Sequence, residues 1–187
     1  MTHPRPSWLR LCHEVAFPRQ LALGIFFLRL FGDRDRTRRR EERLCRCAVG
    51  TVGRALRGFL AARGLHLVPG YERHDLKHVL FGFGTDPPDE MRMQAYMWGN
   101  APLGLDSALG VLFLVWTPDI WRELPALCRR GRAAPRLDRL DFDAVMDADL
   151  EGLRQRLGIV ALDPEAGIVG LVAARSAGAI DAHHDGV

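Results

Sequence analysis

Apolar residues recur at the spacing of an amphipathic helix along most of this 187-residue chain. In the N-terminal part they return every three or four positions within two runs, first at Trp8, Leu11 and Val15 and then at Leu21, Ile25 and Leu28. The alternation typical of a strand is not sustained anywhere, and residues 168–172, which come nearest to it, are too few to build a sheet. We therefore predict an all-α fold, a single-domain bundle of about seven or eight helices.

Several helix boundaries can be predicted in the first part of the chain. Pro18 is expected to divide the N-terminal run into two helices, because proline removes a backbone donor. Residues 34–43 carry many charges of both signs and are predicted to form a solvated turn. A helix over residues 44–60 is expected to follow, with Gly64 closing it.

A pair of helices joined by a tight glycine turn is predicted next. The first helix covers residues 71–81, and Gly84 lies in the turn. Asp86 is placed to cap the second helix, with Pro87 in its first turn and Asp89 at the position of a capping box.

Toward the C-terminus, helices are predicted over residues 106–116, 120–130 and 147–157. We expect one helical domain over residues 8–160. Residues 161–187 are rich in small side chains and are predicted to form a partly flexible tail.

Composition narrows the class of protein. The net charge of +3 and the absence of interleaved basic and aromatic residues argue against a nucleic-acid binder. Lys77 is the only lysine among 26 cationic residues. This bias indicates a GC-rich bacterial genome; the alternative is a phosphate-binding surface, because arginine presents a planar fork.

The chain is expected to be a bacterial cytoplasmic protein. The apolar run over residues 21–31 contains Arg29 and is too short to span a bilayer, and the N-terminus lacks the pattern of a signal peptide. The spacing of the cysteines matches no zinc ribbon or redox motif, so reduced thiols are predicted. These cysteines are Cys12, Cys45, Cys47 and Cys128.

The segment His74-Asp75-Leu76-Lys77-His78 places two histidines four residues apart. On a helix such residues lie on one face, one turn from each other, where two imidazoles can bind the same cation. Asp75 lies about a hundred degrees round the helix from His74. It is a candidate ligand or a residue that orients a ligand.

Glu90 is the carboxylate best placed to join these histidines. If the chain turns near Gly84, His78 lies six residues before the turn and Glu90 six residues after it. An antiparallel helix pair brings the two to the same level, and helices roughly 8–10 Å apart allow their side chains to meet at one metal.

Two histidines with one or two carboxylates leave open positions on a metal, which is typical of a catalytic site. The set suits zinc, and also Fe(II) or Mn(II). The alternative is that two histidines at this spacing are ordinary surface residues without a metal.

The segment with His74, Asp75 and His78, followed by Gly82 and by Glu90, resembles the signature of the Coq4 family of ubiquinone-biosynthesis proteins. Near the C-terminus, residues 153–159 are similar to the closing helix of that family. The resemblance covers roughly residues 10–160.

This resemblance implies an all-helical fold and a divalent metal bound by His74, Asp75, His78 and Glu90. Zinc is the first candidate for this metal. The resemblance implies action in the C1 oxidative decarboxylation of a polyprenylated hydroxybenzoate-type ring. It also implies a pocket for this polyprenylated quinone precursor, contact with a membrane, and association with other quinone-biosynthesis proteins.

Three hypotheses for the function stay open. The protein is either the enzyme, with Asp75 as catalytic base or fourth ligand, or a non-catalytic prenyl-lipid-binding scaffold that organises other enzymes. A helical interaction protein without metal is the third hypothesis. A homodimer through an apolar helix face is also compatible with the sequence.

Methionine and aromatic side chains surround the predicted metal site and are candidates for contact with a long apolar ligand. The alternative for each of them is an ordinary core position. These residues are Phe81, Phe83, Met91, Met93, Met97 and Trp98.

Overall fold

A computed structural model describes residues 7–101, 110–111 and 113–159. The described chain is all-α: it contains helices and one isolated bridge, between Thr51 and Asp149, and no strand within those ranges. The predicted all-α class is therefore confirmed. The predicted C-terminal tail lies outside the described residues, as do residues 106–109 and 112 of the helix predicted over residues 106–116.

The N-terminal helix is not divided at Pro18. Helix α1 (Ser7–Leu11) continues through a π-helical turn (Cys12–Ala16) into α2 (Phe17–Phe31). The backbone N–H of Phe17 donates to the carbonyl of Cys12, five residues back. The prediction of a break was wrong, because the wider π-turn ends just before Pro18 and leaves the proline in the first turn of α2, where its missing donor costs little.

The charged segment after α2 is also helical, against the predicted turn. Helix α3 (Arg34–Leu44) begins after Asp33, whose side chain accepts a hydrogen bond from the Arg36 backbone N–H at 2.9 Å. The helix predicted over residues 44–60 starts only at Val52, as α4 (Val52–Ala61), with Thr51 as its N-cap. Gly50, at φ +88°, allows the intervening turn.

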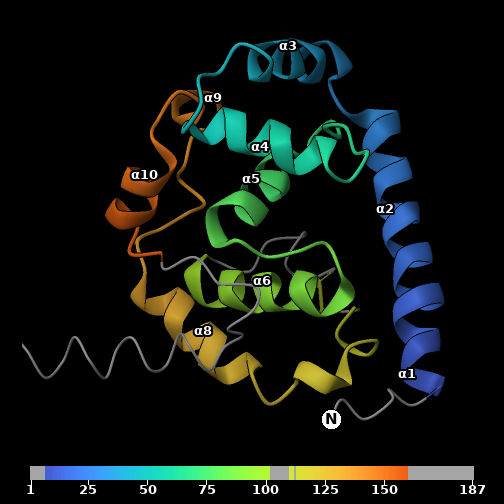
Figure 1. The fold of residues 1–187 in the computed structure, drawn as a ribbon. Helices are drawn as coiled ribbons and strands as arrows, with labels where there is room; N and C mark the ends of the chain where they lie inside the picture. Colours follow the sequence, from blue (N-terminus) through green and yellow to red (C-terminus); the bar gives the residue numbers. More distant parts are fainter. Residues whose placement is uncertain (1–6, 102–109, 112, 160–187) are drawn as a thin grey trace, which may run out of the picture.

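The central helix pair agrees with the prediction to within a residue. It consists of α5 (Glu72–Phe81) and α6 (Pro87–Asn100), which lie in the middle of the molecule between α4 and the later helices (Figure 1). Asp86 caps α6, as predicted, by accepting from the Asp89 N–H. Asp89 does not form the predicted capping box; its carboxylate instead accepts from the Gly84 N–H at 2.8 Å.

The later helices differ in detail from the predicted ones. A 3-10 turn (Pro118–Ile120) precedes α8 (Leu124–Ala133), and two short helices, α9 (Phe142–Val145) and α10 (Leu150–Arg156), complete the described fold. The main hydrophobic core includes Leu56, Leu80 and Phe142, which are almost fully buried, and gathers α4, α5, α6, α9 and α10.

Two glycines bring α6 and α8 unusually close together. A Cβ atom at Gly99 would lie 1.9 Å from the Cys128 carbonyl oxygen, and one at Gly131 would lie 1.9 Å from the carbonyl oxygen of Tyr96. Only glycine fits at such contacts. The buried Asn100 amide also donates to the Gly131 carbonyl, so α6 is fixed against α8.

Candidate metal centre

Helix α5 carries both histidines of the motif and is held at its C-terminal end. Gly82, at φ +75°, terminates the helix in the left-handed conformation, and its N–H donates to the His78 carbonyl at 2.8 Å. Arg154 of α10 donates to the carbonyls of Val79 and Leu80, at 2.7 and 3.0 Å. The C-terminal segment therefore fixes the helix that presents the histidines.

The turn between α5 and α6 is tied to the rest of the fold by a chain of charged groups. Asp89 binds the Gly84 N–H with one oxygen and the Arg92 guanidinium with the other. Arg92 continues to Glu123 through two hydrogen bonds, of 2.8 and 3.2 Å. These contacts fix the level at which α6 returns alongside α5, and with it the position of Glu90.

His74, His78 and Glu90 meet between the two helices. The Nε2 atom of His74 lies 3.0 Å from Glu90 Oε2, and Nε2 of His78 lies 3.2 Å from Glu90 Oε1. The two Nε2 atoms are 3.1 Å apart. In the described part of the chain, these residues form a group whose ligand atoms all lie within 4.8 Å and could hold a metal ion.

These separations can be compared with those of a metal site. Ligand atoms 2.0–2.1 Å from a tetrahedral zinc lie roughly 3.3 Å apart, and the cis ligands of an octahedral ion lie roughly 3.0 Å apart. The three distances, 3.0, 3.1 and 3.2 Å, fit both arrangements. The residues therefore suit a divalent ion, with open coordination positions, and do not distinguish zinc from Fe(II) or Mn(II).

Aromatic rings orient both imidazoles. Tyr71 stacks on His74 with ring centroids 4.0 Å apart, and Phe59 stacks on His78 at 5.2 Å. Nδ1 of His78 is buried without a hydrogen-bond partner, so packing sets the angle of this ring. Sequence reasoning did not identify either partner. Tyr71 had a signal, three residues before His74 at the start of the helix, whereas nothing in the sequence marked Phe59.

Burial and hydrogen bonding favour the protonation states that metal binding needs. Burial lowers the pKa of His74, which favours the neutral ring. Burial alone would raise the pKa of Glu90, but the charge and hydrogen bonds of His74 and His78 lower it to about 2. A carboxyl group with this pKa is ionised at neutral pH. Neutral imidazole and ionised carboxylate are the metal-binding forms.

Asp75 is not part of the group formed by the other three residues. It lies close enough for His78 and Glu90 to influence its titration, and burial raises its pKa to about 7. A carboxyl group with a pKa near neutrality can accept or release a proton under physiological conditions. This placement suits the role of a base better than the role of a metal ligand. Both roles of Asp75 stay predictions.

The residues predicted to contact a lipid are divided between two apolar clusters. Phe81, Phe83 and Met97 lie in the main core, where the ring of Phe81 is 4.6 Å from that of Tyr96. Met91 and Trp98 belong to a second cluster with Phe17 of α2. Their contact with a lipid stays a prediction.

Among solved structures, the chain is similar to a crystal structure from Nostoc punctiforme described as a "putative ubiquinone biosynthesis protein". The two share 20% identical residues with a TM-score of 0.48, over 82% of each chain. No family model and no curated protein matches the chain.

Proposed function

We propose that this protein is a divalent-metal enzyme of ubiquinone biosynthesis. The observation that supports this most is the convergence of His74, His78 and Glu90 from two helices, with separations of 3.0–3.2 Å. Three protein ligands would leave positions for substrate, as in catalytic rather than structural sites. The sequence motif that these residues form resembles the Coq4 signature, which supplies the biosynthetic context.

The proposed reaction is the C1 oxidative decarboxylation of a polyprenylated hydroxybenzoate-type ring. The bond between the ring and its carboxyl group breaks, CO₂ leaves, and a hydroxyl group forms at the same carbon. Dioxygen would supply the oxygen atom, and a two-electron donor with two protons would reduce the second atom to water. The bound metal would act as a Lewis acid that stabilises charge developing on the ring oxygens.

Within this proposal, the residues of the site have separate roles. His74, His78 and Glu90 hold the ion, and the rings of Tyr71 and Phe59 keep the imidazoles in place. Asp75 accepts a proton from the ring hydroxyl, since burial raises its pKa to about 7.

Contact with a membrane is the second part of the proposal, because a polyprenyl substrate resides in a bilayer. Five large apolar side chains of α1 and α2 are 55–61% exposed: Trp8, Leu11, Leu23, Phe26 and Leu30. Exposed Arg10 and Arg19 on the same helices would favour an anionic surface. No helix among the described residues is long and apolar enough to cross a bilayer. A second copy of the chain, or another quinone-biosynthesis protein, is the alternative occupant of this face.

Turnover of a prenylated hydroxybenzoate by the metal-loaded protein tests the reaction. We expect the wild type to release CO₂ and His78→Ala to lose activity by at least about a hundredfold, because a ligand is removed. Arg38→Gln, at an exposed position on α3 that pairs with Glu42 and has no contact with the group, is the control and should keep its activity. Unchanged turnover in His78→Ala would contradict the proposal.

The alternative function is a scaffold that binds the prenyl lipid without transforming it. The near-complete burial of His78 and Glu90, at 2% and 9% exposure, supports a structural ion that fixes the hairpin. Copurification of a prenyl lipid with metal-loaded protein that turns over no substrate, with any of the three metals, would favour this alternative.

A further inference from the structure

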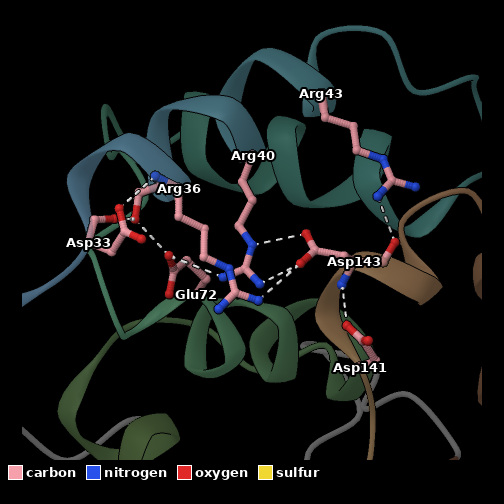
Figure 2. Close-up of polar contacts among 8 residues, drawn as sticks. Asp33, Arg36, Arg40, Arg43, Glu72, Asp141 and Asp143 are labelled. Carbon is pink, nitrogen blue, oxygen red and sulfur yellow. Dashed lines mark hydrogen bonds and ion pairs between the residues drawn. The ribbon is translucent and has the colours of Figure 1, made fainter.

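Four arginines of α3 lie on one face of that helix, and none of them belongs to the metal centre. Arg36, Arg39, Arg40 and Arg43 are spaced at i, i+3, i+4 and i+7, and together with Asp143 they line a cavity of about 300 Å³. Figure 2 shows Arg36, Arg40 and Arg43 extending from α3 toward the start of α9.

The cations of this arginine groove outnumber its anions. Asp143 is the one carboxylate among the five lining residues, and its Oδ2 accepts from both Arg36 and Arg40, at 3.3 and 2.6 Å. Arg43 donates to the Asp143 carbonyl at 2.7 Å and pairs with Asp147. None of the ion pairs in the described ranges involves Arg39. Each guanidinium carries five donors, so many N–H groups stay available.

One of the four arginines forms a fixed floor, and the others form an accessible rim. The Arg40 side chain is 10% exposed, lies over the Phe142 ring and pairs with both Glu72 and Asp143. The side chains of Arg36 and Arg43 are 57% and 40% exposed, and Arg39 is exposed as well. The groove therefore combines one preset guanidinium with three that can close around a ligand.

We propose that the arginine groove is a binding site for a phosphate-class oxyanion. Guanidinium groups bind tetrahedral oxyanions through parallel N–H donors, and the groove contains no lysine. Like charges at i, i+3 and i+4 on a helix repel each other, and a bound dianion would reduce this repulsion. The anion would come either from a free phosphate group or from the head group of an anionic phospholipid.

The first arm of the test measures inorganic phosphate. The metal-free, full-length protein is titrated by calorimetry against a chloride reference of equal ionic strength, so that binding at the metal centre does not contribute. We expect saturable binding, weakened about tenfold in Arg39→Gln and about a hundredfold in Arg36→Gln/Arg39→Gln, because removing one charge-assisted hydrogen bond weakens affinity roughly tenfold. Arg38→Gln is the matched control: Arg38 is on α3 but pairs with Glu42 and does not line the groove.

The second arm measures vesicles of phosphatidylglycerol against vesicles of phosphatidylcholine, with the same variants. Phosphate binding that the groove variants weaken identifies a free phosphate group as the source. Binding to anionic vesicles alone, again weakened in the groove variants and unchanged in Arg38→Gln, identifies the lipid head group. Absence of both, or equal loss in Arg38→Gln and in the double variant, would overturn the proposal. Arg40 is left unchanged throughout, because it balances the buried Glu72.

Discussion

The two helices of the central hairpin each carry a buried glutamate in the first turn, Glu72 on α5 and Glu90 on α6. Both are less than one tenth exposed, at 5% and 9%. Glu72 accepts a hydrogen bond from the Thr37 hydroxyl at 2.7 Å and pairs with Arg40 at 3.3 Å (Figure 2). Glu90 contacts two imidazoles instead.

The difference lies in the charge of the partners. A guanidinium is cationic at every accessible pH, so Arg40 balances Glu72 permanently. An imidazole, unlike a guanidinium, exists in a neutral form around pH 7, so the charge of Glu90 is fully balanced only when a proton or a metal ion is bound. Burial of a carboxylate is therefore not enough to identify a metal centre. The chemical type of the side chains that contact the carboxylate distinguishes the two cases.

The largest effect on stability is expected when Glu72 loses its cationic partner. Arg40→Leu leaves a buried carboxylate without its charged partner, and we expect the free energy of unfolding to fall by about 3–5 kcal/mol in urea denaturation. Arg38→Leu, on the exposed face of the same helix, should change it by less than about 0.5 kcal/mol. Equal effects of the two substitutions would show that Arg40 does not stabilise Glu72.

The second effect appears only when metal is added. Zinc at about a hundred times its Kd should raise the free energy of unfolding of the wild type by about 2.7 kcal/mol. His78→Asn should lose this increment at the same zinc concentration, and Glu72→Gln should keep it. Comparing the increment rather than the absolute stability removes the effect of disturbing the buried His78 ring. A full increment in His78→Asn would contradict the assignment of this ligand.

Asp75 should make the stability of the metal-free protein depend on pH. Burial raises its pKa from 3.8 to about 7, so the folded state binds a proton more tightly than the unfolded state. This contribution is present below pH 4 and is lost as the pH rises toward 7. We expect a fall of about 2 kcal/mol, half of what three pKa units would give, because Asp75 is partly exposed. Unfolding at several pH values should show the fall in the wild type, and its persistence in Asp75→Asn would assign it to another group.

The smallest effect is expected at the turn between α5 and α6, which places Glu90 at the same level as the two histidines. Gly82 adopts φ +75°, which costs a residue with a Cβ about 1–2 kcal/mol, so Gly82→Ala should destabilise by that amount and weaken metal binding. Gly58 lies within α4 and has open space around it. Gly58→Ala should therefore stabilise by about 0.5–1 kcal/mol without affecting metal binding. The same sign for both substitutions would show that Gly82 does not set the turn.

The sequence predicted both helices of the hairpin and the partners of Glu90, and it missed the partners of Glu72 on α3. The histidine spacing, the glycine turn and the Asp86 cap are local signals, so α5 and α6 were predicted closely. The mixed charges of residues 34–43 are typical of a solvated turn, and their pattern alone does not predict the helix that forms there. In the structure, Arg40 is paired with Asp143, which lies 103 residues further along the chain. Local pattern cannot reveal such a partner, and it did not reveal the stacking of Phe59 on His78 either.

The comparison of the two glutamates is tested most directly by metal analysis of three proteins side by side. Wild type, Glu90→Gln and Glu72→Gln are stripped with chelator, reloaded separately with zinc, Fe(II) and Mn(II), and titrated for stoichiometry and affinity. We expect the wild type and Glu72→Gln to bind one ion per chain, and Glu90→Gln to bind at least about a hundredfold more weakly. Equal affinity in Glu90→Gln, or no stoichiometric metal in the reloaded wild type, would contradict the metal centre.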